Sequence, residues 1–306
     1  MSIIKLRVPG STSNLGSGFD TLGLAIDLHL IVRFELLHSG FEIHTRGEGA
    51  GTILQLEQNL IVVAFDRLCR ELQIERPPLR IDIENRIPMK RGFGSSGAAI
   101  IAGLVAANLF FDQKFSAMQL LEMACEMEHH PENVSASLLG GLTVNDLENG
   151  RLQCTRFVPP SEWVAACFVP ELEIATHTAR ALLPENIPHR DAVQNTQRVA
   201  TLVAAFAKRE PSLLRFGVQD FLHQKYRKAL IPGFEEICAA ADRAGAYASF
   251  LSGSGSTILA ICPSQRGKKI STAMAQAAAR FDLSGKTMVL KFAREGVDRV
   301  MRKRRG

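Results

Sequence analysis

The sequence contains no apolar run long enough to span a bilayer. The longest one, Gly97 to Phe111, is interrupted by Asn108 and is shorter than the roughly 20 residues that a membrane-spanning helix needs. We therefore predict a buried helix there and no membrane partner. The first residues also lack the apolar stretch of a secretory signal peptide, so we expect a cytoplasmic protein.

Cysteines are few and isolated. None of the six lies close enough to another to form a Cys-x-x-Cys motif, and none has a histidine nearby at the spacing of a metal site. This pattern is typical of structural thiols in a reducing compartment, where disulfides are rare.

Tryptophan and tyrosine are scarce: the chain has one Trp and two Tyr. No stretch interleaves aromatic residues with Lys or Arg. No nucleic-acid partner is therefore predicted. The net charge is +5, but the nine residues from Asp298 to Gly306 hold five basic residues and one acidic residue. The rest of the chain is thus nearly neutral. We expect this basic tail to be solvated, and the alternative is an arm that touches RNA or lipid.

What is present is an ordinary globular composition, 46% hydrophobic and 22% charged. A length of 306 residues suggests two domains, and Pro159-Pro160-Ser161 is the best linker candidate. Helical and alternating patterns intermix without strict strand–helix alternation, which favours an α+β fold over a doubly wound one. We expect strands near residues 3–8, 22–37, 41–46, 79–84, 140–145, 151–158, 163–169, 246–251, 257–261 and 287–292. We expect helices near residues 59–72, 97–111, 116–129, 191–208, 234–243 and 265–281, with Ser116 as an N-cap.

The strongest local signal is the glycine loop, Ile87 to Ala98, which reads IPMKRGFGSSGA. It lies between an expected strand and the start of the apolar helix. Glycines let backbone N–H groups approach an anion, and a helix N-terminus adds about half a positive charge. The hydroxyls of Ser95 and Ser96 can donate to phosphate or bind Mg²⁺. A tight turn with a helix N-cap is the alternative interpretation.

Other phosphate motifs fit this chain less well. Gly92-x-Gly94-x-x-Gly97 matches a dinucleotide pattern, but the charged pair Lys90-Arg91 stands where that motif has an apolar strand end. The lysine of the P-loop is absent, and Gly285-Lys286-Thr287 lacks the first glycine of that motif and precedes an expected strand. Protein-kinase landmarks are absent as well.

Three blocks in order resemble the GHMP family of small-molecule kinases. The glycine loop has the family form Pro-x-x-x-Gly-x-Gly-Ser-Ser-Gly-Ala, with Phe93 in place of the usual Leu. An earlier block, Val8 to Gly23, and a later one, Leu251 to Thr257, resemble the first and third motifs. The resemblance implies a two-domain α+β fold with an ATP-binding domain at 1–158 and a ferredoxin-like C-terminal domain at 159–306. ATP and substrate would then bind in the cleft between the domains.

Within this superfamily, the sequence is most similar to the homoserine kinases. The supporting segments are Glu128–Val134, Thr176–Pro184 and Asp220–Gly233. The resemblance implies transfer of the γ-phosphate of ATP to the side-chain hydroxyl of L-homoserine, a step in threonine biosynthesis, with Mg²⁺ as cofactor. Three further positions depart from the family pattern: His129 replaces Gly, Glu132 replaces Asp, and Ser256 replaces Pro.

The resemblance also implies which residues bind ATP and the metal. The ATP-binding residues are Pro88, Lys90, Arg91, Gly92, Phe93, Gly94, Ser95, Ser96, Gly97 and Ala98. Ser96 and Glu128 would hold Mg²⁺, which prefers hard oxygen ligands such as a hydroxyl and a carboxylate. The alternative for Glu128 is an exposed helix position. The third motif, which would close the site from the second domain, comprises Ser252, Gly253, Ser254 and Gly255.

The substrate-binding residues implied by the resemblance are Asn14, Asp20, His130, Thr176, Arg180 and Arg227. Arg180 and Arg227 would bind the carboxylate, because a guanidinium fork grips two oxygens. Asp20, with Asn14 beside it, would bind the ammonium. Asn133 would orient the reacting hydroxyl and stabilise charge. Asp20 is the candidate base, and the alternative is that the proton passes to the phosphate itself.

Simpler roles stay open for these residues, namely surface ion pairs for the arginines and turn or helix caps for Asp20, Asn14 and His130. Two other functions also stay open: a GHMP kinase for another small alcohol, and a nucleotide-binding paralogue without activity. The presence of Ser96, Glu128 and Asn133 argues against the second. A homodimer is compatible with the sequence.

Overall fold

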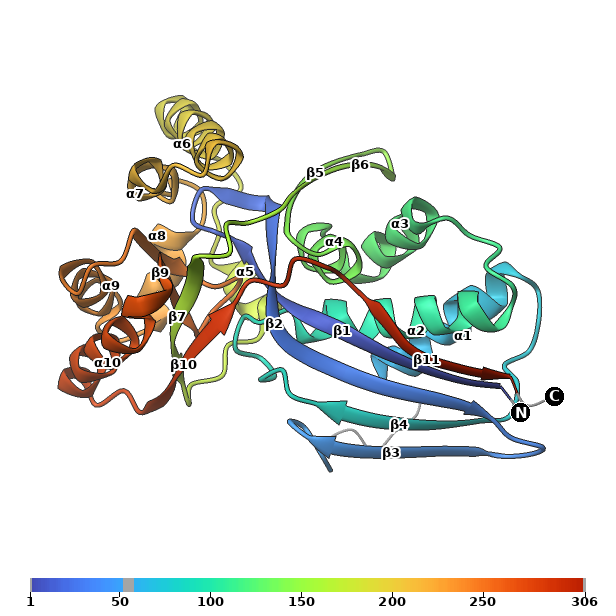
Figure 1. Ribbon diagram of the computed structural model, residues 1–306. Helices are drawn as coiled ribbons and strands as arrows, with labels where there is room; N and C mark the ends of the chain where they lie inside the picture. The colour runs from blue at the N-terminus through green and yellow to red at the C-terminus, as the bar shows by residue number, and fades with distance from the viewer. Residues whose placement is uncertain (1, 52–57, 305–306) are drawn as a thin grey trace.

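Two β-sheets with helices packed on them make up the molecule, and the chain passes from the first sheet to the second at residues 158–162 (Figure 1). The computed structural model describes residues 2–51 and 58–304. Within these residues the first sheet has seven strands, in the order β11-β1-β2-β4-β3, with β5 beside β2 and β6 beside β5. Its strands are β1 (Ser2–Asn14), β2 (Gly18–Leu36), β3 (Phe41–Gly47), β4 (Leu79–Asn85), β5 (Leu142–Glu148), β6 (Arg151–Phe157) and β11 (Asp298–Arg304).

Four helices cover one face of the first sheet (Figure 1). They are α1 (Leu60–Glu71), α2 (Ser95–Phe110), α3 (Ala117–Glu128) and α4 (Glu132–Leu139). The alternation in β4 places Leu79, Ile81 and Ile83 in the core beneath them. The opposite face carries charged side chains, such as Arg33, which pairs with Asp82 at 2.9 Å. The expected period-two and helical patterns are therefore confirmed in this half.

The second sheet has the order β10-β7-β9-β8. Its strands are β7 (Trp163–Pro170), β8 (Ala248–Leu251), β9 (Ile258–Pro263) and β10 (Gly285–Lys291). The helices of this half are α5 (Thr176–Ala181), α6 (His189–Lys208), α7 (Leu214–Gly217), α8 (Gln224–Arg227), α9 (Phe234–Arg243) and α10 (Gly267–Ala278). The helix expected at 265–281 is shorter than predicted, because 3-10 turns occupy both of its ends. The α+β class is confirmed.

One hydrophobic core joins the two halves. Every residue of β7 is buried: Ala166 and Phe168 face a core with α9 and α10, whereas Ala165 and Cys167 belong to the same core as β1 and β2. Apolar surface is thus removed from water on both sides of β7, which stabilises the contact between the halves. The site described below therefore lies between two halves that are packed together.

The basic tail forms a strand that the sequence did not predict. Residues 298–304 form β11, which pairs antiparallel with β1, with Ile4 opposite Arg302. Backbone N–H and C=O groups of the edge strand β1 thereby gain partners, and charged residues are common on strands at a sheet edge. Asp298, Arg299 and Val300 are exposed, so the expected solvation of the tail agrees with the structure at these residues, although the backbone is ordered as a strand. Arg305 and Gly306 lie outside the described residues. The last strand of the segment 159–306 thus lies in the first sheet.

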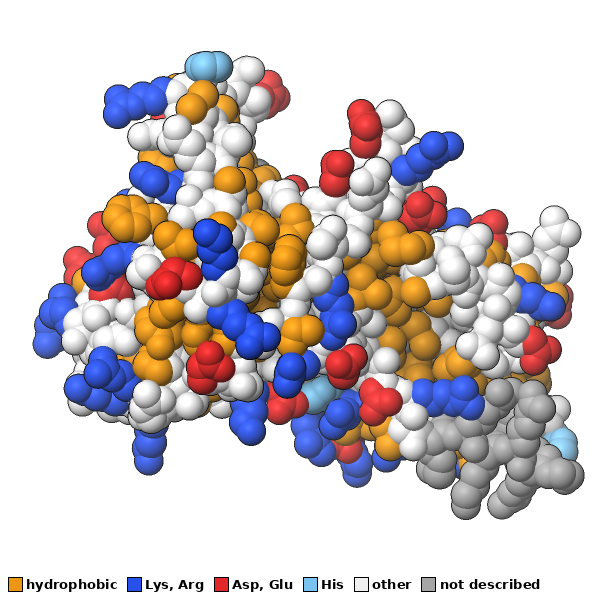
Figure 2. Space-filling view, turned by 45° about the horizontal axis from the view of Figure 1, so that its top comes forward, with side chains coloured by type: hydrophobic (Ala, Val, Ile, Leu, Met, Phe, Trp, Pro, Cys, Tyr) orange, Lys and Arg blue, Asp and Glu red, His pale blue; other side chains and the backbone are white. Residues whose placement is uncertain are grey.

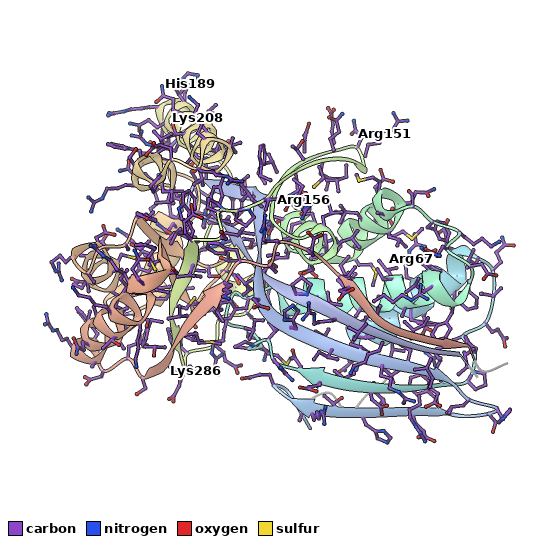
Figure 3. The ribbon with its side chains drawn as sticks, in the orientation of Figure 1. Arg67, Arg151, Arg156, His189, Lys208 and Lys286 are labelled. Atoms are coloured by element: carbon purple, nitrogen blue, oxygen red, sulfur yellow. The ribbon has the colours of Figure 1, made fainter. Side chains whose placement is uncertain are left out.

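The connection that leads back to the first sheet is held by Arg156 of β6 (Figure 3). Its Nε donates to the carbonyl oxygen of Gly140 at 3.2 Å, and its Nη2 donates to the carbonyl oxygen of Arg294. Basic and acidic side chains are interspersed on the face seen in Figure 2. In the part of the chain that the structure describes, no helix is both long and apolar enough to cross a membrane.

The capping box of α3 allows a direct stability test. The Oγ of Ser116 accepts from the N–H of Gln119, and the Gln119 side chain accepts from the N–H of Ser116. Ser116→Ala should lower the free energy of unfolding by about 1 kcal/mol, because a helix-end N–H loses its partner. Urea denaturation measures this loss. The exposed Ser161→Ala serves as control and should change stability by less than about 0.5 kcal/mol. Equal losses of stability in the two variants would show that the capping box does not stabilise α3.

Candidate active site

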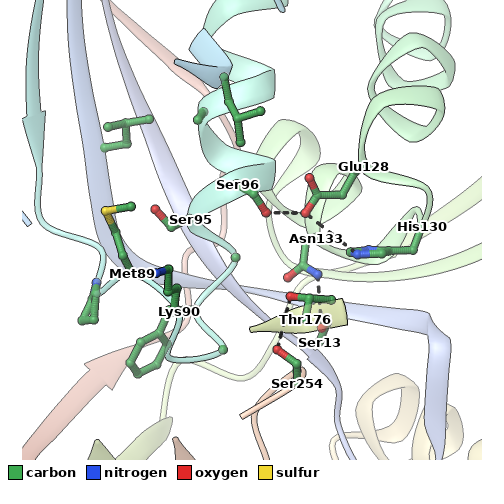
Figure 4. Close-up of a pocket in the computed structure, with 18 of the residues that line it drawn as sticks. Ser13, Met89, Lys90, Ser95, Ser96, Glu128, His130, Asn133, Thr176 and Ser254 are labelled. Atoms are coloured by element: carbon green, nitrogen blue, oxygen red, sulfur yellow. Dashed lines mark hydrogen bonds and ion pairs between the residues drawn. The ribbon is translucent and has the colours of Figure 1, made fainter. Parts of the chain in front are cut away.

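A cavity of about 370 Å³ lies between the two halves and collects side chains from both. It brings together most of the residues that the sequence singled out. These are Asn14, Asp20, Pro88, Lys90, Gly92, Phe93, Gly94, Ser95, Ser96, Glu128, His130, Asn133, Thr176, Arg180, Arg227, Gly253 and Ser254. Figure 4 shows how Ser96, Glu128, His130 and Asn133 converge in it.

Five predicted residues do not line this cavity. The side chain of Arg91 turns toward the second half, where its Nη2 donates to the carbonyl oxygen of Glu171 at 2.6 Å. Gly97 and Ala98 lie in the first turn of α2, and Ala98 is buried in the core. Ser252 and Gly255 belong to the third motif but do not line the cavity: the Oγ of Ser252 donates to the carbonyl oxygen of Gly92, and the N–H of Gly255 donates to that of Ser252.

The glycine loop leads into an uncapped helix N-terminus. Gly94 is the N-cap of α2 with a φ of 64°, and no side chain caps the helix there. A Cβ on Gly94 would lie 2.1 Å from the Oγ of Ser11, so the loop packs closely on β1. The first N–H groups of a 16-residue helix therefore face the cavity edge beside Ser95 and Ser96. Such a terminus binds anions, phosphate in particular.

The third motif holds the glycine loop and the first motif together. The Oγ of Ser252 donates to the carbonyl oxygen of Gly92 at 2.6 Å. The N–H of Gly253 donates to the carbonyl oxygen of Ser13 at 3.1 Å, and the Nδ2 of Asn14 donates to the carbonyl oxygen of Gly253 at 3.1 Å. These bonds join residues that are 160 to 240 positions apart in the sequence.

Glu128, the last residue of α3, presents a buried carboxylate to the α2 terminus. Its Oε1 accepts a hydrogen bond from the Oγ of Ser96 and lies 3.9 Å from the Nε2 of His130 (Figure 4). Burial raises the pKa of Glu128, and the hydrogen bond from Ser96 and the charge of His130 oppose this rise. The predicted alternative, an exposed helix position, is wrong.

Asn133 and Glu132 begin α4 and are held from several sides. The Nδ2 of Asn133 donates to the Oγ of Ser13 at 3.2 Å and to Glu132 Oε1 at 3.1 Å, and its Oδ1 accepts from Ser11 at 2.9 Å. Glu132 Oε1 also lies 3.1 Å from the Nδ1 of His130. Glu132 Oε2 is buried and has no hydrogen-bond partner among the described residues.

One part of the cavity is lined by charged side chains. Arg180 donates to both oxygens of Asp20, at 2.6 and 2.9 Å. The guanidinium carbons of Arg180 and Arg227 lie 5.4 and 5.2 Å from the centroid of the Phe19 ring. Burial lowers the pKa of Arg227 to about 10, and the neighbouring charge of Arg180 acts in the same direction. The two arginines predicted to share one ligand thus lie on one aromatic ring.

Sequence reasoning assigned no role to several residues of the site. Ser11, Ser13, Phe19 and Glu132 stand within the quoted motifs, so motif membership was the available signal. The sequence did not indicate the apolar residues that line the cavity, because no pattern linked them. They come from β2, α1, β4 and the glycine loop, and they are Leu30, Leu60, Ile61, Ile83 and Met89. Asn59 beside them is the N-cap of α1 and accepts from the N–H of Ile61 at 3.0 Å.

The sequence of the chain is similar to those of known proteins. Residues 59–141 match the family model described as GHMP kinases N terminal domain, and residues 202–280 match GHMP kinases C terminal. A homoserine kinase of Caldanaerobacter subterraneus subsp. tengcongensis is 40% identical over 268 residues, 88% of this chain and 86% of the relative. A homoserine kinase of Desulfitobacterium hafniense is 38% identical over 294 residues, 96% and 99% of the two chains. The chain belongs to the homoserine kinase family of GHMP kinases.

A solved structure agrees with this assignment. The crystal structure of homoserine kinase from Cytophaga hutchinsonii superimposes with a TM-score of 0.88 at 29% identity, covering 97% of each chain. The family and the two-domain GHMP kinase fold implied by the three motifs are therefore confirmed. The roles of the single residues in this homoserine kinase family member stay predictions.

Gly92 provides a test of the contact between the motifs. Its φ is 78°, and a Cβ there would lie 2.0 Å from the carbonyl oxygen of Ser252. Gly92→Ala should destabilise the protein by more than the about 1–2 kcal/mol that a left-handed residue costs, and should raise KM for ATP at least about 10-fold. Thermal unfolding and initial-rate kinetics measure both effects.

Gly150→Ala is the matched control for this variant. Its φ is 77°, and nothing lies within 4 Å of the added Cβ. The control should show the conformational cost alone and an unchanged KM for ATP. If the two variants lose equal stability and bind ATP alike, the glycine loop is not held by the third motif.

Proposed function

We propose that the protein transfers the γ-phosphate of ATP to the side-chain hydroxyl of L-homoserine, giving O-phospho-L-homoserine and ADP, as a step in threonine biosynthesis. The observation that carries the proposal is the position of the Arg180–Phe19–Arg227 cluster. It lies with Asp20 in the same cavity as the N-terminus of α2. Groups suited to an amino acid and groups suited to phosphate therefore line one cavity. The relatives named above carry the same activity in their names.

ATP would occupy the cavity with its phosphates at the α2 N-terminus. The helix dipole and the N–H groups beside Ser95 and Ser96 favour negative charge there. The apolar end lined by Leu30, Leu60 and Ile83 suits the flat base of the nucleotide. Lys90, which also lines the cavity, adds positive charge near the phosphates.

Ser96 and Glu128 fit Mg²⁺ as ligands. Both present hard oxygen donors, and these already meet at the α2 N-terminus. Among the described residues there is no cluster of three or more His, Cys, Asp or Glu side chains that could hold a metal. A Mg²⁺ ion bound by one or two protein oxygens and by substrate phosphates needs no such cluster. When bound, it would neutralise phosphate charge during transfer.

The charged end would bind the amino-acid part of the substrate. Arg227 and Arg180 would receive the carboxylate, since two guanidinium groups flank the same ring. Two carboxylates are available for the ammonium, Asp20 and Glu132. Both oxygens of Asp20 accept from Arg180, whereas Oε2 of Glu132 is free of hydrogen bonds within the described residues. Substrate binding would therefore loosen the Asp20–Arg180 pair or use Glu132.

Asn133 would place the reacting hydroxyl. Hydrogen bonds with Ser11, Ser13 and Glu132 fix its amide. The side chain therefore loses little conformational entropy when the transition state forms. An amide accepts no proton near neutral pH, so Asn133 acts as an orienting group. Because Arg180 occupies both oxygens of Asp20, we favour passage of the hydroxyl proton to the transferred phosphate over a base role for Asp20.

The proposal also includes a cellular location and an oligomeric state. A cytoplasmic location agrees with the six cysteines, which are all free thiols in the structure. A homodimer stays a prediction that size-exclusion chromatography can check.

The substrate assignment is tested by coupled ADP release across a panel of alcohols. L-Homoserine should be turned over fastest. L-Serine should be at least about 10-fold slower, because its hydroxyl is one carbon short of the position at Asn133. 3-Aminopropan-1-ol should also be poor, because it lacks the carboxylate for Arg227. Faster turnover of mevalonate or a sugar would identify a GHMP kinase for another alcohol, and no turnover of any member would identify a paralogue without activity.

Glu128→Gln tests the metal role. The variant should lower kcat about 10-fold or more and raise the Mg²⁺ concentration needed for half-maximal rate, because a neutral amide binds Mg²⁺ weakly. A magnesium titration at saturating ATP measures both. Glu126→Gln on the same helix is the control, since Glu126 is exposed and pairs with Arg67. Equal magnesium dependence in the two variants would remove Glu128 from the ligand set.

A further inference from the structure

His223 is a buried histidine outside the cavity that connects the first motif with Arg227. Its side chain is fully buried, and it lies directly before α8. Its Nε2 lies 2.8 Å from the carbonyl oxygen of Gly16. Its ring stacks on Phe19 with a centroid distance of 5.0 Å, and its Nδ1 lies 3.3 Å from the Nη1 of Arg227.

These contacts determine the tautomer of His223. A carbonyl oxygen only accepts hydrogen bonds, so Nε2 must carry the proton that is donated to Gly16. In the neutral ring, Nδ1 is then an acceptor, which suits the Nη1–H of Arg227. Burial lowers the pKa of His223, and among the charges that face it Arg227 acts in the same direction, whereas Asp220 and Asp20 oppose it.

The segment around His223 is itself held firmly. The carboxylate of Asp220 accepts from the backbone N–H groups of Leu222, His223 and Gln224, at 3.0, 2.9 and 2.5 Å. The backbone of His223 is therefore held independently of the contacts of its ring. The ring, which has little freedom on this backbone, can in turn restrict the side chain of Arg227 through Nδ1.

Arg227 has few other contacts. Its Nε donates to the carbonyl oxygen of Ala179 at 3.2 Å, and its Nη1 donates to that of Gly253 at 3.3 Å as well as to His223. Among the described residues, Nη2 has no hydrogen-bond partner, and Arg227 lines the cavity. The contacts thus hold one edge of the guanidinium and leave Nη2 available for a ligand.

We propose that His223 is a positioning residue that orients Arg227 to receive the carboxylate of the amino-acid substrate. This inference rests on the proposed function, because it assumes that Arg227 binds that carboxylate. Arginine side chains carry considerable rotamer freedom. The Nδ1 acceptor removes part of this freedom before the substrate arrives, so less of it is lost on binding.

Two conservative variants separate this role from a structural one. His223→Asn places an amide oxygen near the position of Nδ1 and can still accept from Arg227. His223→Gln places its amide near the position of Nε2 and can still donate to Gly16. Positioning through Nδ1 predicts that Gln lowers kcat/KM for L-homoserine about 10-fold, mainly through KM, whereas Asn stays within about threefold of the wild type. KM for ATP should stay within about twofold in both.

Combining each variant with Arg227→Leu completes the test. Without the guanidinium, His223→Gln should cause no further loss in kcat/KM for L-homoserine, because the partner of Nδ1 is gone. His29→Gln is the control, since His29 is a partly buried histidine on β2 that does not line the cavity. It should leave KM for L-homoserine unchanged in both backgrounds.

Each outcome decides for or against the role. If Asn is the more damaging variant, or if the losses from His223→Gln and Arg227→Leu multiply, His223 only supports the fold and the proposal is overturned. An equal rise in KM for ATP and for L-homoserine would overturn it too. Failure of the proposed function is recognised separately, because the wild-type protein would then not phosphorylate L-homoserine.

Discussion

The hydrogen bonds of Ser252 and Gly253 to the glycine loop and the first motif are the contacts on which the site depends. They join Gly92, Ser13 and Asn14 to a segment from the other half of the chain, and no space remains for a side chain at Gly92. Because a buried backbone group without a partner is costly, the three segments stabilise one another. The cavity is lined by all three segments, so the α2 N-terminus and the Arg180–Phe19–Arg227 cluster share one support.

Charge is arranged around this support in two groups. In the proposed function the first group binds phosphate: it comprises the α2 terminus and Lys90, with the oxygens of Glu128 and Ser96 beside them. The second group contains both signs of charge: Asp20 pairs with Arg180, and Arg227 lies near the same Phe19 ring as Arg180. A zwitterionic ligand can pair its carboxylate with an arginine and its ammonium with a carboxylate of this group. Each buried charge of the ligand then has a partner of opposite sign, which offsets the cost of removing it from water.

Much of the fold and the identity of the motifs could be predicted. The alternation in β4, the N-cap at Ser116 and the apolar α2 are local patterns, and local backbone preference decided them. The three motifs are contiguous strings, so their relation to a family was visible without coordinates. The tail was different: the charges of residues 298–304 masked a strand whose pairing with β1 depends on backbone groups far away in the sequence.

The sequence by itself determined the α+β class, the glycine loop at the start of α2 and the membership of the GHMP kinases, because each depends on neighbouring residues. The tertiary structure alone decided which groups are free to bind. It paired Asp20 with Arg180, turned Arg91 toward Glu171, left an oxygen of Glu132 without a hydrogen bond among the described residues, and placed His223 behind Arg227. Asp20 and Arg180 lie 160 positions apart in the sequence, and Arg91 and Glu171 lie 80 positions apart. No local pattern encodes contacts over such separations.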